Sequence, residues 1–535
     1  MAKRPARPVA QEGFVRETFR HAAIYSGASV LARTISFIML PFYAHILRNI
    51  GYGVIGMIDA SLTFLGSLFA YNFRGAITRI YHEEPDPARK PLAVTTGVII
   101  VLALTVPLTG IAMLFSRPLS GLLFGDPGYW HLICLAFGAF VLDTAGQTAL
   151  VVLVIRRKSL VFSLLSLVRL VIGLGLNILL VVILRWDLTG YFLAGLLTSL
   201  LGSAIGIAVA VRECKVGLGF DRKLARDLIA FQLPLVPSSL ATFASRQVER
   251  ILVRYQIDIG TLGVLEMGYK FPVLLNMLII TPFMSSWQTK RTEIAEEPGA
   301  PERIGRMFAY FLYLALLGGL IIAADIRVLL QLLTPEEFWG AFRIARVEVV
   351  TTVLMGCYGY LQFGLFWAKK TDLIARTRIV TAIGKVGLSY LMISLWGIYG
   401  AAYSAMIMNA VLVVWIHILS QRYYHQIIEW HKIALIVGGA ALLFVAIDRI
   451  ETATIAGWLQ PLAPAARALV DRLADTWLGT WKDGKVVALL DRSGILVVDL
   501  AVRTLLCGLF LLLMPFVHVE TQQKLARRFP LPRSR

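Results

Sequence analysis

Residues 233–270 read LPLVPSSLATFASRQVERILVRYQIDIGTLGVLEMGYK, and this stretch combines the length of a membrane helix with charged side chains. Ser238, Thr242, Arg246 and Glu249 recur at helical spacing and form a polar stripe in otherwise apolar sequence. An ionisable side chain at the bilayer centre costs about 2.5–3.5 kcal/mol on insertion scales, so such groups usually face a bundle interior or a wet cavity. The stretch therefore predicts a membrane helix that lines a polar cavity.

The whole chain has the composition of a membrane protein. Of its 535 residues, 57% are hydrophobic, the mean hydropathy is +0.72, and apolar runs long enough to cross a bilayer recur along the sequence. We predict an all-α polytopic membrane protein with about fourteen transmembrane helices. The expected spans are 20–44, 54–74, 92–115, 130–154, 160–184, 189–211, 228–250, 259–284, 307–326, 343–368, 375–396, 399–420, 432–448 and 495–518.

The formal net charge is +19, and the positions of the Lys and Arg residues indicate membrane topology rather than a surface that binds nucleic acid. Lys and Arg concentrate in the N-terminal arm, in alternate short loops and in the tail, whereas the intervening loops hold few. This asymmetry is typical of cytoplasmic loops and predicts that both termini are cytoplasmic. We expect membrane lipids as partners and no nucleic acid.

A short internal repeat predicts the domain organisation. The residues IG and GVI within 50–55 match IG and GVL within 259–265, with one residue inserted, and six expected spans separate them. Two parallel six-helix lobes followed by two further helices would give this pattern. The expected parts are a basic cytoplasmic arm (1–19), an N-terminal lobe (20–211), a cytoplasmic linker (212–227), a C-terminal lobe (228–420), and a last part (421–535) with a periplasmic amphipathic insertion (449–494) and a basic cytoplasmic tail.

Arg33 and Arg246 are the first candidates for binding a substrate. Arg33 lies near the middle of the first expected span, and alignment of the repeats places it about one helical turn from the counterpart of Arg246. Guanidinium groups bind phosphate oxygens in bidentate fashion, which favours a phosphate-bearing substrate. Alternatively, Arg33 only pairs with a buried carboxylate such as Asp59 or Asp143.

Further charged residues in the same spans are candidates for supporting roles. Arg250 and Lys270 could bind substrate, although Arg250 could equally pair with Glu249, and Lys270 with Glu266 one turn away. Counter-charge or ion coupling is expected from the acidic candidates Asp59, Asp143, Glu249 and Glu266. The sequence has no Walker A motif and no His/Cys ligand cluster, so we predict no cofactor, no metal and no catalytic residue.

Four segments resemble one family of transporters. PFYAHILRNIGYG (41–53), GAITRIYHE (75–83), LPLVP (233–237) and GTLGVLEMGYKF (260–271) are similar to segments of Wzx-type oligosaccharide flippases. These belong to the multidrug/oligosaccharidyl-lipid/polysaccharide exporter superfamily, whose fold is MATE-like. The resemblance covers roughly residues 20–420, and Glu266 departs from it because the family often has Tyr there.

The resemblance implies a flippase rather than an enzyme. Such a protein moves an undecaprenyl-diphosphate-linked glycan across the bacterial inner membrane, for exopolysaccharide or O-antigen (lipopolysaccharide) biosynthesis. It works by alternating access, with coupling to H⁺ or Na⁺, and works alongside a polysaccharide polymerase and glycosyltransferases.

Three other functions stay open at this point. A multidrug/cation antiporter of the same superfamily would need an acidic, aromatic site for organic cations. A membrane glycan polymerase or ligase would need a periplasmic catalytic loop, for which only the 449–494 insertion is large enough. A non-transporting scaffold could recruit glycosyltransferases through its basic loops.

Overall fold

The computed structural model describes residues 37, 39–69, 73–87, 89–214, 219–449 and 499–513, and these residues form helices joined by short loops. Twelve of the described helices are long and apolar enough to span a membrane. They correspond to the second through thirteenth expected spans. The first expected span (20–44) and the last (495–518) lie largely outside the described residues. The prediction of an all-α polytopic membrane protein is confirmed.

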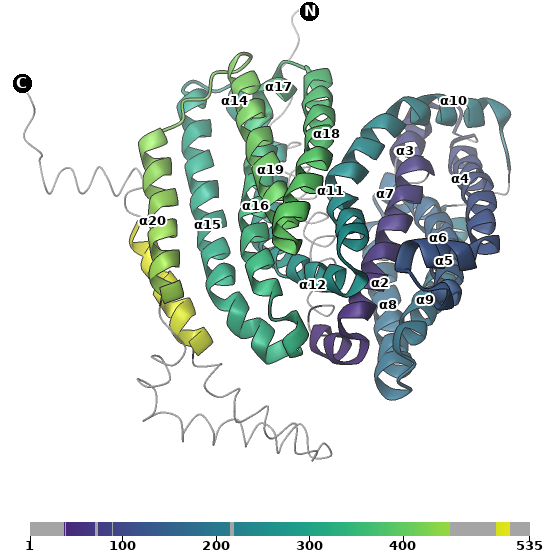
Figure 1. The fold of residues 1–535 in the computed structure, drawn as a ribbon. Helices are drawn as coiled ribbons and strands as arrows, with labels where there is room; N and C mark the ends of the chain where they lie inside the picture. The colour runs from purple at the N-terminus through teal and green to yellow at the C-terminus, as the bar shows by residue number, and fades with distance from the viewer. Residues whose placement is uncertain are drawn as a thin grey trace, which may run out of the picture. The chain divides into compact units, whose positions relative to one another are not determined.

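The chain forms two compact units, residues 1–263 and 264–535. The first unit contains α2 (Leu40–Phe69), α3 (Phe73–Glu83), α4 (Lys90–Leu114), α5 (Ser116–Phe124), α6 (Trp130–Ala149), α7 (Val151–Ile155), α8 (Ser159–Asn177), α9 (Asp187–Cys214), α10 (Arg222–Gln232), α11 (Val236–Gln256) and the start of α12 (Ile259–Lys270). Within it α6 packs along α9, and α2 packs along α11 (Figure 1).

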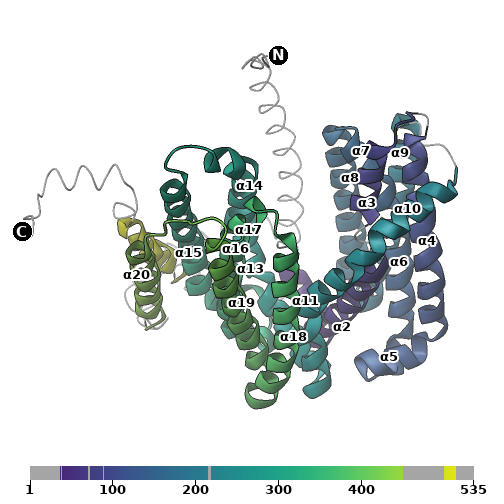
Figure 2. The same cartoon turned by 90° about the horizontal axis from the view of Figure 1, so that it is seen from above.

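The second unit holds the remaining helices. They are α13 (Pro272–Leu275), α14 (Thr281–Ala295), α15 (Ala300–Leu333), α16 (Ala341–Leu361), α17 (Phe363–Trp367), α18 (Thr371–Trp396), α19 (Ile398–Gln421), α20 (Trp430–Arg449) and a C-terminal segment, 499–513, that ends in the 3₁₀ turn η6 (Gly508–Leu513). Helix α16 packs between α15 and α19, and α20 packs on α15 (Figure 2).

The predicted lobe boundaries (20–211 and 228–420) stay a prediction. The division of the chain into compact units falls inside α12, because α11 packs on α2 of the first unit. The predicted amphipathic insertion (449–494) lies outside the described residues, apart from Arg449 at the end of α20.

The same turn occurs in both units at corresponding places. After α7 the chain passes through Arg157, whose φ is 55°, and after α17 it passes through Lys369, whose φ is 57°. In each turn the following lysine donates its backbone N–H to a carbonyl five residues earlier, at 2.8 Å in both cases. A non-glycine residue with positive φ is uncommon, so two matched examples between matched helices support the internal repeat.

The two glycine motifs of the repeat contact each other within the first unit. A Cβ on Gly53 would lie 1.9 Å from the carbonyl oxygen of Ile259, and a Cβ on Gly263 would lie 1.8 Å from that of Asn49. Only hydrogen fits at either position, so these glycines allow the middle of α2 and the start of α12 to touch backbone to backbone. The contact is reciprocal, as expected where two copies of one motif meet.

Aspartate side chains organise two loops next to these helices. Burial raises the pKa of Asp258, but hydrogen bonds from Thr261 outweigh it and hold that pKa below its usual value. Asp221 accepts backbone N–H groups at the start of α10 and pairs with Arg89, and that guanidinium lowers the pKa of Asp221. Both carboxylates therefore fix helix starts in their charged form.

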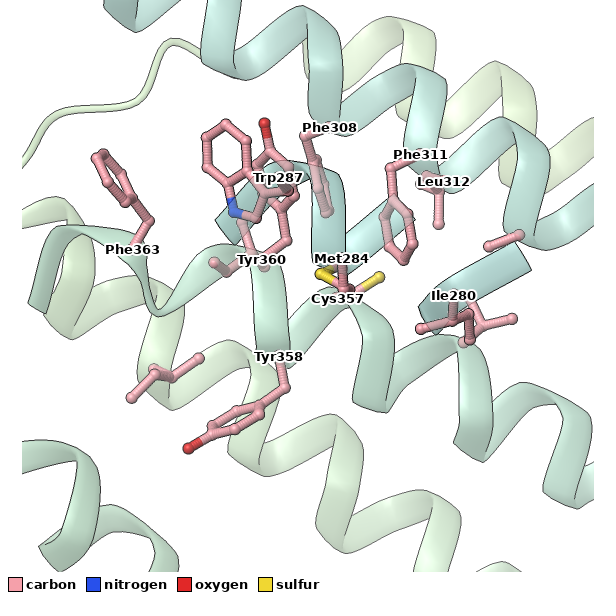
Figure 3. Close-up of a cluster of buried hydrophobic side chains, with 14 of the residues drawn as sticks. Ile280, Met284, Trp287, Phe308, Phe311, Leu312, Cys357, Tyr358, Tyr360 and Phe363 are labelled. Carbon is pink, nitrogen blue, oxygen red and sulfur yellow. The ribbon is translucent and has the colours of Figure 1, made fainter. Parts of the chain in front are cut away.

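Aromatic side chains fill the core of the second unit (Figure 3). The Trp287 ring stacks on Tyr360 with ring centroids 4.3 Å apart, and Phe308 packs on the same tyrosine. The Tyr360 hydroxyl donates to the carbonyl of Ile304 at 2.8 Å. This cluster ties α14, α15 and α16 together into a rigid core.

Candidate functional site

The polar stripe predicted in 233–270 lies mainly on α11. Pro234 stands in a 3₁₀ turn between α10 and α11, and Pro237 stands at the first turn of α11, where its missing N–H costs nothing. The Phe243 ring packs on Phe64 of α2, with centroids 5.2 Å apart. This contact places the next turn of α11, which carries Arg246, beside α2.

The register of the two helices brings opposite charges to one level. Gly53 of α2 contacts Ile259, and Phe64 of α2 contacts Phe243, so the helices run antiparallel. Asp59 lies between these two contact points on α2, at the level of Arg250 on α11. Both Asp59 and Arg246 are exposed. Since charged groups at membrane depth avoid lipid, this exposure indicates a water-accessible surface.

The rest of the α11 stripe is more buried. Glu249 is 2% exposed and Gln247 is 8% exposed. Arg250 is half-buried, and its Nη1 donates to the Gln247 side chain and to the carbonyl of Arg246 at 3.3 Å. Arg250 is thus held along its own helix, whereas the Arg246 side chain extends to the surface.

A second charged group joins α3, α6 and α8. Arg169 of α8 forms a salt bridge with Asp143 of α6, with side chains that are 28% and 39% exposed. Arg74 of α3 donates to the Gln147 side chain, one turn from Asp143, at 3.5 Å. Arg169 pairs with Asp143, and Arg74 lies close enough for the charge of Asp143 to act on it, so this group carries a net positive charge.

Small residues on α6 and α9 make room for this group. A Cβ on Gly146 would lie 2.8 Å from the Cα of Ser203, so α6 and α9 approach closely there. The Ser203 hydroxyl donates to the carbonyl of Leu142 at 2.7 Å. The Arg169 side chain lies over Gly202, where a Cβ would be 3.2 Å from it. Small side chains at helix crossings permit this tight packing in membranes.

The predicted site residues fall into three groups. Asp59, Arg246, Glu249 and Arg250 come together on α2 and α11, while Asp143 belongs to the α3–α6–α8 group. Glu266 is buried and Lys270 exposed, both on the part of α12 that belongs to the second unit. Arg33 lies outside the described residues.

The sequence did not predict two members of the site. Arg74 of α3 donates to the Gln147 side chain. Arg169 of α8 is the partner of Asp143. A signal was present, because Arg169, Asp143 and Arg74 all stand in apolar spans.

The chemistry of these residues suits an anion. The membrane-depth charges described in the first unit include four arginines (74, 169, 246 and 250) and three carboxylates (59, 143 and 249). The arginines on α11, α3 and α8 offer planar N–H donors for phosphate or carboxylate. Among the described residues, no group of three or more His, Cys, Asp or Glu side chains could hold a metal ion.

The sequence matches a known protein family. The sequence profile of the family described as "Polysaccharide biosynthesis protein" matches residues 19–287. The chain belongs to this family. A comparison with curated protein sequences gave no match.

Solved structures of transporters share the fold of this family member. A lipid II flippase, MurJ, in an inward-closed conformation has a TM-score of 0.62 at 12% identity, over 89% of this chain and 97% of that chain. An inward-facing multidrug resistance MATE family transporter of the MOP superfamily has a TM-score of 0.51 at 15% identity, over 73% and 94% of the respective chains. A eukaryotic MATE transporter has a TM-score of 0.50 at 13% identity, over 76% and 96%. At these identities the likeness establishes the fold.

Proposed function

We propose that the protein is a flippase that moves an undecaprenyl-diphosphate-linked oligosaccharide from the cytoplasmic to the outer leaflet of the bacterial inner membrane. The product would serve exopolysaccharide or O-antigen biosynthesis. Membership of a polysaccharide biosynthesis family supports a substrate that carries a glycan. The observation that carries the proposal is the exposed Arg246 on α11, in a unit where the described membrane-depth arginines outnumber the carboxylates by four to three.

Each charged group has a part in this proposal. Arg246 binds the diphosphate or an acidic sugar, with Arg250 and Arg33 contributing further positive charge. Lys270 is a separate candidate for substrate binding in the second unit. Asp59 and Glu249 balance the arginines when no substrate is bound. Alternating access then exposes the same cationic surface to each side of the membrane in turn, with an H⁺ or Na⁺ gradient as the energy source.

The arrangement of Lys and Arg supports an orientation with both termini cytoplasmic. The basic loops and tail then face the glycosyltransferases that assemble the glycan. The polymerase that consumes the flipped unit would act on the opposite side. Labelling of single cysteines in the N-terminal arm and in the tail with an impermeant reagent, on intact cells, tests this orientation; rapid labelling of either would overturn it.

A deletion strain tests the function. We expect lipid-linked repeat units to accumulate in the inner leaflet, with loss of surface polysaccharide. Accumulation in the outer leaflet would indicate a polymerase or ligase instead. Sensitivity to cationic drugs with normal polysaccharide would indicate a drug antiporter.

A matched pair of variants tests the binding residue. Arg246→Ala should reduce export about tenfold or more at equal protein levels, because a hydrogen bond to a charged group contributes about 1.5–3 kcal/mol. Arg226→Ala, which removes an exposed arginine from α10, should leave export unchanged. Equal export by the two variants would refute the role of Arg246.

A further inference from the structure

Three arginine side chains lie beside one aromatic ring where α15 meets α16. The ring is that of Phe342, which is half-buried in the first turn of α16. The guanidinium carbons of Arg327, Arg343 and Arg346 lie 5.8, 5.6 and 5.1 Å from its centroid. Arg343 also lies 5.6 Å from the centroid of the Tyr399 ring of α19. Cations at these distances are attracted to aromatic rings, so Phe342 keeps the three guanidinium groups together.

Arg346 forms the fixed base of this cluster. Its Nε donates to the carbonyl of Ala323 in α15 at 2.9 Å, and its Nη2 pairs with Asp448 Oδ1 of α20 at 2.8 Å. Helices α20, α15 and α16 lie next to one another in this order (Figure 1). The Arg346 side chain is only 15% exposed, so these contacts hold it, and the ring beside it, against all three helices.

Arg327 and Arg343, in contrast, are exposed. Neither forms an ion pair within the part of the chain that the structure describes, although Glu336 and Glu337 stand in the 3₁₀ turn just before α16. Both guanidinium groups therefore have N–H donors available for an added anion. The other carboxylates at this end already accept from another group: Asp448 from Arg346, Asp499 from Arg503, and buried Asp325 from the Thr504 hydroxyl.

Exposed aromatic residues place the cluster at the level of lipid headgroups. Trp396 at the end of α18 is 55% exposed, and its ring packs edge-on against Tyr403 of α19 with centroids 5.9 Å apart. Tyr399, which contacts Arg343, stands one turn before Tyr403 on the same helix. Trp and Tyr gather at the membrane–water interface, so the arginines lie where the phosphate groups of lipids are found.

The orientation proposed above places this cluster in the outer leaflet. The loop between the expected spans 307–326 and 343–368 is one of those that hold few Lys and Arg residues. Three arginines at one point are therefore unusual on this side of the membrane. The concentration of positive charge in cytoplasmic loops does not account for them, so they call for a local anionic partner.

We propose that Arg327 and Arg343 bind the phosphate group of an anionic lipid in the outer leaflet, with Phe342 and Arg346 as the rigid base of the site. Guanidinium groups match phosphate oxygens in bidentate fashion, and side chains that are already restrained lose less entropy on binding. Two lipids present this group: an anionic phospholipid, and the diphosphate-linked glycan that the proposed flippase delivers. The choice of leaflet rests on the proposed orientation, whereas the site uses none of the proposed substrate-binding residues.

Photo-crosslinking of the purified protein reads this site separately from the basic loops. A phosphatidylglycerol analogue with a photoreactive group next to its phosphate is irradiated with the protein, and the labelled residues are mapped by mass spectrometry. We expect labelling within 327–343, and at least about tenfold less of it in Arg327→Gln/Arg343→Gln, because hydrogen bonds to a charged group are lost. Arg117→Gln/Arg185→Gln removes two exposed arginines from the first unit and should leave this labelling unchanged.

A third variant and a set of competitors complete the test. Phe342→Leu keeps all three charges and should label several-fold less, because the ring no longer restrains the guanidinium groups. Displacement at lower concentration by a polyprenyl diphosphate would identify the transported lipid as the ligand, and by phosphatidylglycerol a phospholipid. Labelling at the parent level in Arg327→Gln/Arg343→Gln or in Phe342→Leu, or displacement by inorganic phosphate as readily as by lipid, would overturn the proposal. The readout needs no transport, so it stays informative if the flippase assignment fails.

Discussion

Replacing either glycine of the repeat by alanine should separate the two helix ends that it joins. In Gly53→Ala the new Cβ would lie 1.9 Å from the carbonyl oxygen and 2.9 Å from the carbonyl carbon of Ile259. In Gly263→Ala it would lie 1.8 Å from the carbonyl oxygen of Asn49. Both neighbours are backbone atoms, so the helix must move by about 1 Å to restore an ordinary contact, and overpacking of this kind costs about 1–3 kcal/mol.

The gain in helix propensity offsets part of this cost. Alanine in a helix interior is favoured over glycine by about 0.5–1 kcal/mol, so we expect a net loss of about 1–2 kcal/mol for each variant. Gly195→Ala in α9 is the matched control, because nothing lies within 4 Å of its Cβ. It should be stabilised by about 0.5–1 kcal/mol through propensity alone.

Unfolding of the purified protein in mixed micelles of increasing SDS content measures these differences. Gly53→Ala and Gly263→Ala should unfold at lower SDS fraction than the parent, and Gly195→Ala at higher. The double variant should lose less than the sum of the two single losses, because one displacement of the helix relieves both contacts. If Gly53→Ala and Gly263→Ala are as stable as Gly195→Ala, the reciprocal contact does not exist.

Three further changes test other parts of the structure by the same unfolding measurement. Asp143→Asn should cost about 1–2 kcal/mol by leaving Arg169 without its counter-charge, less than for a fully buried pair, and Arg169→Gln added to it should recover part of the loss. Asp221→Ala should destabilise at pH 7, and its difference from the parent should persist down to the usual aspartate range, about pH 4, and vanish only as pH falls further, because the folded-state pKa of Asp221 is lowered. Trp287→Ala should cost about 3–5 kcal/mol by emptying the stacked core, while Trp287→Phe should cost much less.

The spans were predictable because each is a long apolar run, and length and hydropathy decide membrane insertion. Twelve of them appear as helices at the expected places. Their ends were less predictable: the span expected at 307–326 extends over Ala300–Leu333 as α15. Asp325 therefore stands well inside a helix rather than at the end of one, which is why its burial could not be foreseen.

Pairing between helices could not be predicted from one sequence. The repeat of the glycine motifs was visible, but not that Gly53 and Gly263 contact the opposite copy. Asp143 was one of two carboxylates, with Asp59, that were considered as partners of Arg33, but the sequence did not indicate that α6 lies close enough to α8 for Arg169 to bind Asp143. Such partners depend on which helices are neighbours, and hydropathy carries no information about that.

Transport by the purified protein in liposomes tests the proposed function most directly. Lipid-linked oligosaccharide is placed in both leaflets, and an impermeant enzyme modifies only the glycan outside. We expect the protein to expose the inner half rapidly, Arg226→Ala to match it, and Arg246→Ala to be at least about tenfold slower. Exposure at the rate of protein-free liposomes would contradict the assignment of a flippase.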